Sequence, residues 1–289
     1  MLGAIAGDII GSCWEGSACA NLPLPLITAQ STFTDDTVCT IALADALISG
    51  RPLAETLRRW VRRYPNRRYG GSFYGWAHAE SAPAYNSFAN GGAMRVSPAA
   101  LLATSIEDAL RMAEETSAVT HNHPDGVQGA RAIAAAIWYA RNGLRPAEIR
   151  ARVETLSGYD LRGSVEHRAS NYGFSVLASE TVPDALVSAL EAKSYEGAIR
   201  NAIAIGGDSD TIACMAGGIA EALYGVPQDI VQTLRSELPD EMYDVLRELY
   251  AFAGQPFPLP GSYIVPVRQH LKIEQPRLLS RVRGWFGGR

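Results

Sequence analysis

Two short stretches of the chain place carboxylates and hydroxyls at the start of a helix-like pattern. The first, Phe-Thr-Asp-Asp-Thr at residues 33–37, precedes an apolar run that ends at Leu47. The second, Gly-Gly-Asp-Ser-Asp-Thr at residues 206–211, precedes a helical face made of Ile212, Met215, Ala216, Ile219 and Leu223. A single Ser, Thr or Asp is enough to cap a helix, so the second acid in each stretch adds a repulsion that a cap does not need.

A hard divalent cation would remove that repulsion, because such an ion prefers several oxygen ligands. Each stretch alone also fits an ordinary helix cap. If the two helix starts meet, however, four aspartates surround one point, and we then expect two ions there. The oxygen-only donor set favours Mg²⁺, Mn²⁺ or Ca²⁺ over Zn²⁺. The sequence therefore predicts that four aspartates far apart along the chain converge in the fold, namely Asp35, Asp36, Asp208 and Asp210.

The composition excludes several other classes of protein. Of 289 residues, 47% are hydrophobic and 19% are charged, and the formal net charge of −4 does not suggest non-specific nucleic-acid binding. The cysteines have no disulfide-like or metal-like spacing, so we expect buried thiols of a reducing compartment at Cys13, Cys19, Cys39 and Cys214. The N-terminus lacks the basic start of a signal peptide, and no apolar run is long enough to span a bilayer. We expect a cytoplasmic protein.

Helical periodicity dominates the sequence, and period-two strand patterns are nearly absent. Helices are predicted at 2–12, 35–49, 52–63, 97–119, an Ala-rich stretch ending at Asn142, 145–156, 183–193, 195–205, 227–237 and 239–252. Residues 64–92 are predicted to be irregular, the arginines between 58 and 68 to lie on a solvated helix face, and the tail from Pro276 to be a helix packed on the body. No linker or repeat interrupts the chain, so we expect one all-α domain over residues 1–289.

Three further features could serve either a site or only the fold. Glu15 opens a long Pro-interrupted segment and could be a functional acid or a surface acid. The pair Gly91 and Gly92 could let backbone N–H groups converge on a phosphate or could form a plain turn. His121 and His123 flank a predicted helix start. Because no third His or Cys lies nearby in sequence, we expect His121 to donate a hydrogen bond there rather than to bind zinc.

Together these motifs resemble the ADP-ribosylglycohydrolase family, the group that includes dinitrogenase reductase-activating glycohydrolase and related ADP-ribosylhydrolases. The resemblance extends from Gly3 to about Gly225. It rests on five ordered motifs: Gly-Asp-Ile-Ile-Gly-Ser-Cys-Trp-Glu at 7–15, Phe-Thr-Asp-Asp-Thr at 33–37, Asn-Gly-Gly-Ala-Met-Arg at 90–95, Thr-His at 120–121 and Gly-Gly-Asp-Ser-Asp-Thr at 206–211. The family implies a single-domain orthogonal helical bundle with two Mg²⁺ or Mn²⁺ ions.

The resemblance also implies a role for each matching residue. One ion would be held by Thr34, Asp35, Asp36 and Asp210. The other would be held by Asp208, Asp210 and Thr211. The diphosphate of ADP-ribose would meet a loop made of Asn90, Gly91, Gly92, Ala93 and Met94. His121 would line the same cleft, and we expect Tyr85 or Phe88 to meet the adenine. Many relatives have Ser where this chain has Gly92, so one hydroxyl donor is absent here.

The activity implied by the resemblance is hydrolysis of the N- or O-glycosidic bond between ADP-ribose and a protein side chain or small acceptor. Glu15, which matches a flap glutamate of some members, would orient the attacking water or move a proton, and Asp35 is the alternative base. Arginine, serine and other linkages all fit the resemblance. A metal-dependent phosphoesterase and a non-catalytic ADP-ribose-binding module stay open as other functions. We expect a monomer that acts on an ADP-ribosylated protein or small conjugate and binds neither membranes nor nucleic acids.

Overall fold

A computed structural model describes residues 1–17, 26–170 and 173–257 of the chain. Within these ranges the chain forms fifteen α-helices and no β-strand, and its one isolated β-bridge joins Ala89 to Leu177. The all-α prediction is therefore confirmed. None of the described helices is both long and apolar enough to cross a membrane. Cys19 and the predicted helix from Pro276 lie outside the described residues.

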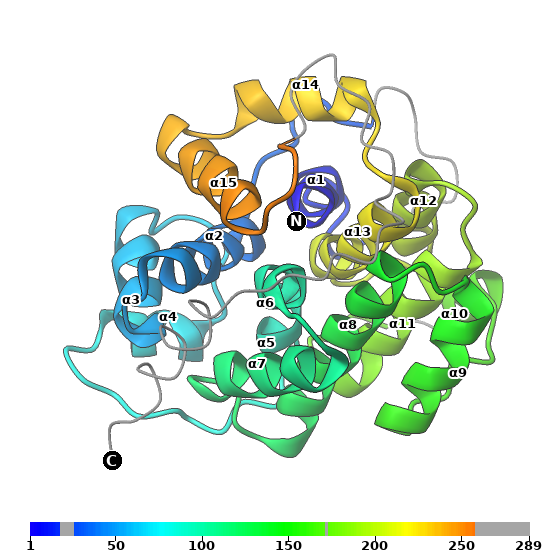
Figure 1. Ribbon diagram of the computed structural model, residues 1–289, viewed down its shortest axis with the longest axis horizontal. Helices are drawn as coiled ribbons and strands as arrows, with labels where there is room; N and C mark the ends of the chain where they lie inside the picture. The colour runs from blue at the N-terminus through cyan, green and yellow to red at the C-terminus, as the bar shows by residue number, and fades with distance from the viewer. Residues whose placement is uncertain (18–25, 171–172, 258–289) are drawn as a thin grey trace.

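The helices surround a central pair, α1 and α13, which lie side by side (Figure 1). The N-terminal group is α1 (Leu2–Gly11), α2 (Asp35–Ser49), α3 (Leu53–Arg63) and α4 (Gly71–His78). The middle group is α5 (Gly91–Met94), α6 (Ser97–Leu102), α7 (Ile106–Ala118) and α8 (Pro124–Arg141). The last group is α9 (Pro146–Ser157), α10 (Val165–Ser170), α11 (Ala178–Glu191), α12 (Tyr195–Ile205), α13 (Ser209–Tyr224), α14 (Gln228–Glu237) and α15 (Asp240–Phe252).

Glycines set the close contact between α1 and α13. Gly3, Gly7 and Gly11 recur every four residues and therefore share one face of α1. A Cβ atom on Gly7 would lie 2.0 Å from the carbonyl oxygen of Ala213, so any side chain there would push the two helices apart. This close approach holds Asp8, which follows Gly7 directly, near the first turn of α13.

Several helices begin and end where the sequence predicts. The predicted ranges 35–49 and 195–205 are the observed α2 and α12. Thr34 caps α2 by accepting a hydrogen bond from the N–H of Asp36, and Gly50 ends it in the left-handed conformation at φ 72°. Both signals lie in the local sequence, which is why these boundaries were predictable.

The predicted helix over residues 97–119 is in fact two helices, α6 and α7. The side chain of Ser105 accepts the N–H of Asp108 at 3.1 Å, and the carboxylate of Asp108 accepts the N–H of Thr104 at 3.1 Å. This exchange of hydrogen bonds resembles a capping box and favours a new helix start over a continued helix. The prediction followed the apolar periodicity and missed the cap.

The predicted helix from residue 183 begins earlier, at Ala178, and holds Pro183 in its interior. A proline at that position removes one backbone hydrogen bond from the helix. However, Val182 and Leu186 on the same helix are fully buried, and that burial outweighs the lost bond. Helix α10 was not predicted at all.

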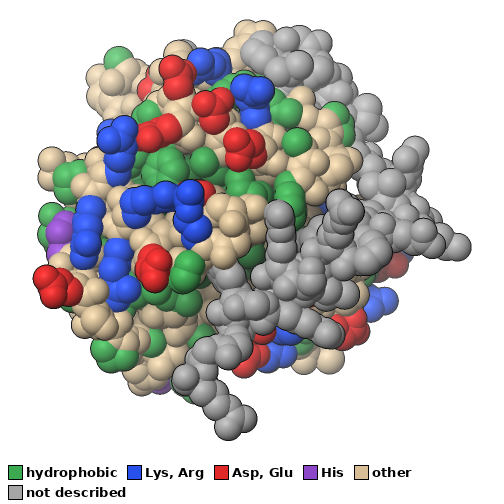
Figure 2. All heavy atoms as spheres, turned by 60° about the vertical axis from the view of Figure 1, so that its left-hand side comes forward, with side chains coloured by type: hydrophobic (Ala, Val, Ile, Leu, Met, Phe, Trp, Pro, Cys, Tyr) green, Lys and Arg blue, Asp and Glu red, His purple; other side chains and the backbone are tan. Residues whose placement is uncertain are grey.

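Residues 64–92 contain a helix that the sequence did not indicate, α4. Its side chains Phe73 and Trp76 are buried. Arg58 Nε donates to the carbonyl oxygen of Trp76 at 3.4 Å, and Arg62 Nε donates to the next carbonyl oxygen along at 3.0 Å. These bonds satisfy carbonyls at the C-terminal end of α4. Arg62 is exposed, as predicted for a solvated face, and Arg58 is partly buried. Basic side chains gather on this side of the molecule (Figure 2).

Candidate metal and ligand site

A cleft of 460 Å³ lies at the N-terminal ends of α2 and α13, where the two acidic stretches meet. One part of its lining, which we call the acidic side, comes from Glu15, Asp35, Asp36, Asp208, Asp210 and Thr211. Another part, which we call the donor side, comes from residues 85–91, Met94, Arg95 and His121. The structure thus brings together motifs that are more than a hundred residues apart in the sequence.

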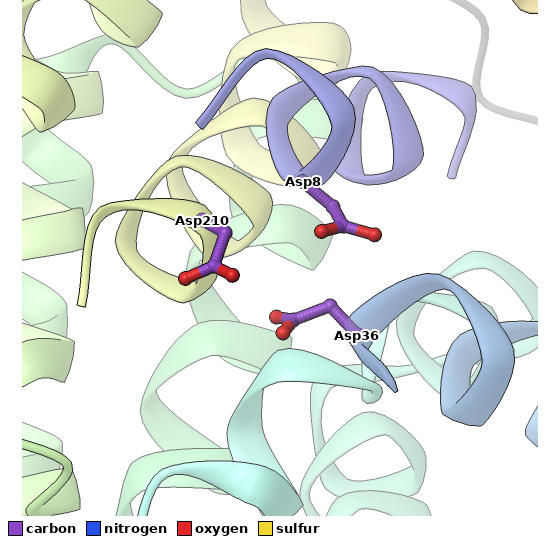
Figure 3. A group of neighbouring side chains, drawn as sticks. All are labelled: Asp8, Asp36 and Asp210. Atoms are coloured by element: carbon purple, nitrogen blue, oxygen red, sulfur yellow. The ribbon is translucent and has the colours of Figure 1, made fainter. Parts of the chain in front are cut away.

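Three carboxylates on three different helices point toward one another (Figure 3). They belong to Asp8 on α1, Asp36 on α2 and Asp210 on α13, and one oxygen of each lies within 4.8 Å of the others. All three residues are almost completely buried. Buried like charges at this separation oppose their own ionisation unless positive charge is present.

A second group of carboxylates meets in the same way. It consists of Glu15, Asp208 and Asp210, again with ligand oxygens within 4.8 Å of one another. Glu15 is exposed, whereas the two aspartates are buried. Asp210 belongs to both groups of carboxylates. It therefore lies where one ligand could be shared by two neighbouring cations.

The residues present fit a hard divalent cation. Asp36 Oδ1 is buried and has no hydrogen-bond partner in the described part of the chain. Its other oxygen, Oδ2, accepts the hydroxyl of Thr211 at 3.1 Å. A buried carboxylate oxygen without a donor is unfavourable, and an oxygen-seeking cation would satisfy it. The acidic side could therefore hold metal ions of the Mg²⁺ or Mn²⁺ type.

The electrostatics of the acidic side point the same way. Burial first, and the neighbouring carboxylates next, raise the pKa of Asp35, Asp36 and Asp210 well above the usual range of an aspartate. Burial also raises the pKa of Asp208, although Asn90 Nδ2 opposes this by donating to Asp208 Oδ2 at 2.7 Å. A bound cation would lower these pKa values again, because it favours the ionised carboxylates.

Asp8 is the residue of this site that sequence reasoning missed. Its carboxylate accepts the N–H and hydroxyl of Thr34, at 3.0 and 2.6 Å, and the N–H and hydroxyl of Thr37, the N–H at 3.1 Å. Three of these four hydrogen bonds end on Oδ2 and one on Oδ1, so both carboxylate oxygens have donors within the protein. Asp8 therefore fixes the start of α2 from a neighbouring helix. The available signal was an acid inside a buried, glycine-rich helix.

The two threonines predicted as metal ligands are placed differently. Thr211 lines the cleft and donates to Asp36. Thr34 is fully buried, donates its hydroxyl to Asp8 and accepts the N–H of Asp36 at 3.3 Å. Thr34 thus acts as the helix cap that supports the acidic side, a role that the sequence also suggested.

Glu15 lies at the cleft in a turn that is held by three contacts. Its Oε2 is 2.9 Å from Nη1 of Arg68, and the same nitrogen donates to the carbonyl oxygen of Ser12 at 2.8 Å. The N–H of Gly16 donates to the carbonyl oxygen of Gly207 at 2.7 Å, which ties the turn to the loop before α13. These contacts hold Glu15 beside the buried aspartates, and its motion as a flap stays a prediction.

On the donor side, the loop predicted to face a diphosphate has two free backbone donors. The N–H groups of Gly91 and Gly92 have no hydrogen-bond partner among the described residues. Those of Ala93 and Met94 both donate to the carbonyl oxygen of Asn90, at 2.8 and 3.0 Å. Ala93 and Met94 belong to the predicted diphosphate loop, but their N–H groups close the turn and are not free to donate to a ligand.

The glycines of this loop are required by close contacts. A Cβ on Gly91 would lie 2.8 Å from Nε2 of His121, and a Cβ on Gly92 would lie 2.2 Å from Oγ of Ser117. A serine at position 92 would collide with Ser117 unless that side chain moved, so the absence of a hydroxyl here has a local packing reason.

The aromatic and histidine residues are partly where the sequence placed them. Tyr85 and Phe88 both line the cleft, Phe88 being 51% exposed, and the ring of Tyr85 meets that of His121 edge-on at 6.1 Å. His123, not His121, caps α8, because its Nδ1 accepts the N–H of Asp125 at 3.2 Å. The expectation of a helix-start donor at His121 is therefore wrong, and His121 is instead buried beside the loop.

The chain is similar in sequence to several known proteins. ADP-ribosylhydrolase ARH3 of Mus musculus is 26% identical over an alignment of length 308, gaps included, and the match covers 79% of this chain and 83% of the mouse protein. ADP-ribosylarginine hydrolase Tri1 of Pseudomonas putida (strain GB-1) is 27% identical over 266 residues, 78% of this chain and 70% of that protein.

Structural and family comparisons extend this similarity over most of the chain. A solved structure described as an ADP-ribosylglycohydrolase-related protein complex superposes with a TM-score of 0.67. The superposition covers 87% of this chain and 97% of that one at 23% identity, which supports the shared fold. The family model for ADP-ribosylglycohydrolase matches residues 1–257. The chain therefore belongs to the ADP-ribosylglycohydrolase family.

Proposed function

We propose that this chain is a metal-dependent hydrolase that cleaves the N- or O-glycosidic bond between ADP-ribose and a protein side chain or small acceptor, releasing ADP-ribose. The observation that carries the proposal is that members of two acidic groups sharing Asp210 line one cleft together with Gly91, whose backbone N–H is free. Family membership supports it, as do relatives named as an ADP-ribosylhydrolase and an ADP-ribosylarginine hydrolase.

The proposed cofactor is a pair of Mg²⁺ or Mn²⁺ ions. One would be held by Asp35, Asp36 and Asp210, and the other by Asp208, Asp210 and Thr211. Such a pair supplies positive charge for ribose hydroxyls and lowers the pKa of a bound water. Thr34 and Asp8 would fix the start of α2 and thereby position the first set of ligands.

Glu15 is the proposed acid–base residue. Its Oε2 is held by Arg68, which leaves Oε1 to accept a proton from the attacking water. Asp35, which also lines the cleft, is the alternative base. Carboxylates on this side would stabilise the positive charge that develops on the ribose in an oxocarbenium-like transition state.

The donor side is proposed to bind the rest of ADP-ribose. The free N–H groups of Gly91 and Gly92 suit the oxygens of the diphosphate. Tyr85 and Phe88 lie where one of them can contact the adenine, a type of contact that is typically worth about 1–3 kcal/mol per base. Binding on this side would place the scissile bond at the acidic side.

The test is a panel of defined ADP-ribosyl linkages, including arginine and serine peptides and a small-molecule conjugate. Each is incubated with the full chain and Mg²⁺, Mn²⁺ or a chelator, and free ADP-ribose is measured by chromatography. We expect metal-dependent release from at least one linkage and none with the chelator. Asp244→Ala, an exposed acid on α15, serves as a control that keeps activity.

Two outcomes would contradict the proposal. Release of phosphate from a generic phosphate ester, with no ADP-ribose released from any linkage, would favour a phosphoesterase. Tight ADP-ribose binding by calorimetry without turnover of any linkage would favour a binding module.

A further inference from the structure

A chain of hydrogen bonds links a buried arginine to the histidine of the donor side. Arg95 is 1% exposed, and its Nη2 donates to Thr120 Oγ1 at 2.8 Å and to the carbonyl oxygen of Thr116 at 3.2 Å. Thr120 Oγ1 in turn lies 2.8 Å from Nδ1 of His121. The three side chains come from two segments, the one after α5 and the one between α7 and α8.

The direction of each bond follows from the chemistry of the groups. A guanidinium has only donors, so the oxygen of Thr120 must accept from Arg95. The hydroxyl has one proton, and Nδ1 of His121 is its one acceptor among the described residues. If Nδ1 carried a proton instead, the buried hydroxyl proton of Thr120 would have no acceptor, so these contacts favour an unprotonated Nδ1. In a neutral imidazole the proton then sits on Nε2.

The Nε2 atom of His121 lies close to the loop that is predicted to face the diphosphate, residues 90–94. A Cβ on Gly91 would be 2.8 Å from Nε2 and 2.9 Å from Cε1, so this edge of the ring faces the backbone of Gly91. His121 lines the cleft, and no hydrogen-bond partner for its Nε2 occurs in the described ranges. Nε2 is therefore close to the backbone of Gly91, whose N–H group has no partner in the described part of the chain.

We propose that Arg95 and Thr120 are positioning residues that hold His121 as the neutral Nε2–H tautomer, so that its ring donates to an oxygen of the ligand beside Gly91. The ligand's identity, ADP-ribose, rests on the proposed function, whereas the tautomer does not. The other neutral tautomer would turn a nitrogen lone pair toward a phosphate or hydroxyl oxygen, which would oppose binding.

The cost of this arrangement supports a role in a site. Nε and Nη1 of Arg95 are buried without hydrogen-bond partners in the part of the chain that the structure describes. A buried charge with so few hydrogen bonds does not stabilise the fold. Proteins keep such unfavourable groups mainly where the residue serves a function. Burial and the charge of Arg95 also lower the pKa of His121 well below its usual range, which keeps the ring neutral.

The tautomer is tested by NMR on the full chain labelled with ¹⁵N-histidine. The chain has five histidines, so a long-range ¹H–¹⁵N spectrum is simple, and His121→Gln assigns the signal. We expect the Nε2–H pattern for His121 in the wild type and in Thr120→Ser, and its loss in Thr120→Val. An Nδ1–H or charged pattern in the wild type would overturn the proposal without any variant, as would an unchanged pattern in Thr120→Val.

The donor role is tested by calorimetry with ADP-ribose in the presence of Mg²⁺. Thr120→Val should weaken binding by about 3- to 10-fold, the effect of one hydrogen bond, and Thr120→Ser by less than about twofold. Thr116→Val is the matched control, because the Thr116 hydroxyl donates to Met112 at 2.7 Å and takes no part in the chain to His121.

The outcomes separate this inference from the proposed function. Wild-type protein with the Nε2–H pattern but no ADP-ribose binding or turnover would refute the proposed function and leave the tautomer standing. A changed pattern in Thr120→Val with unchanged affinity, or equal losses in Thr116→Val and Thr120→Val, would overturn the donor role.

Discussion

The acidic side of the cleft and its donor side differ in which polar groups the protein leaves without partners. On the acidic side, Asp36 keeps a buried carboxylate oxygen with no hydrogen bond in the described structure. On the donor side, the N–H group of Gly91 has no acceptor within the described residues, and neither does that of the adjacent Gly92, while Nε2 of His121 has no partner there. One side therefore lacks positive charge and the other lacks acceptors. A cation completes the first, and an oxygen-rich ligand completes the second.

A comparison within the acidic side shows that proximity alone does not make a ligand. Asp8 and Asp36 belong to the same group of carboxylates. Asp8 accepts four hydrogen bonds from Thr34 and Thr37, whereas Asp36 has an oxygen without any. We therefore expect Asp8 to matter for stability and Asp36 to matter for the cation.

The largest effect is expected from Asp210→Ala. Asp210 belongs to both acidic groups, so its loss removes a ligand from each proposed ion. Turnover of the substrate found in the linkage panel should fall to the detection limit, and Mn²⁺ binding measured by calorimetry should be lost. Retained Mn²⁺ affinity would show that the two groups do not share this ligand.

Glu15→Gln should lower turnover by about 10²–10⁴-fold, the usual effect of removing an acid–base residue. The affinity for ADP-ribose should change little, because the donor side and the ions supply most of the binding. Steady-state kinetics and calorimetry measure the two quantities. Glu241→Gln is the matched control, since Glu241 is also partly exposed and pairs with an arginine, Arg63, at 2.8 Å. If Glu15→Gln turns over substrate at the wild-type rate, Glu15 is not the base, and Asp35 becomes the proposed base.

Asp8→Ala should destabilise the fold by about 3 kcal/mol or more. The change leaves the N–H and hydroxyl groups of Thr34 and Thr37 without acceptors, and each buried unsatisfied group typically costs about 1–3 kcal/mol. Urea unfolding of the metal-free protein measures the effect. An unchanged midpoint would mean that α2 does not depend on α1 for its cap.

The sequence predicts those parts of the fold whose signals are local. Helix α2 has its cap at Thr34 and its end at Gly50, and both were recognisable. Helix α4 has no such signals, and its carbonyls are satisfied by Arg58 and Arg62 from α3. Because these contacts join separate segments, periodicity and capping rules did not reveal them.

The candidate site divides in the same way. The pairs Asp35–Asp36 and Asp208–Asp210 were recognisable because each helix start has more charge than a cap needs. The role of Asp8 depends on the packing of α1 against its neighbours, and the roles of Arg95 and Thr120 depend on hydrogen bonds across two segments. For Asp8, the glycine spacing of α1 was a usable signal of close packing.

Asp36→Asn should have the opposite sign to Asp8→Ala in metal-free protein. It removes one of the mutually repelling charges, so the free energy of unfolding should rise. Metal at about 100 times its Kd stabilises a folded protein by about 2.7 kcal/mol, and we expect this gain in the wild type but not in the variant. Thermal unfolding with Mg²⁺ and with a chelator measures both. Equal metal-induced shifts would exclude Asp36 as a ligand.

The smallest expected effect is the pH dependence of stability that arises from His121. It tests whether this ring of the donor side stays neutral. Burial first, and the charge of Arg95 next, lower the pKa of His121 well below its usual range, while Tyr85 meets the ring only edge-on. The ring should therefore stay neutral in the folded protein from pH 7.5 to 5.5. In the unfolded chain it gains a proton near pH 6.5, so the unfolded state binds more protons as the pH falls. The contribution of His121 to stability thus decreases below about pH 6.5.

This pH effect is measured as a difference between two proteins. Urea unfolding of the wild type and of His121→Gln at pH 7.5 and 5.5 should show that the wild type loses more stability than the variant as the pH falls over this range. The other acids of the cleft are common to both proteins, so much of their contribution cancels. NMR titration should show no shift of the His121 ring signals. A titration midpoint near pH 6.5 in the folded protein would mean that the ring is not held neutral, and the donor side would then gain a positive charge in acid.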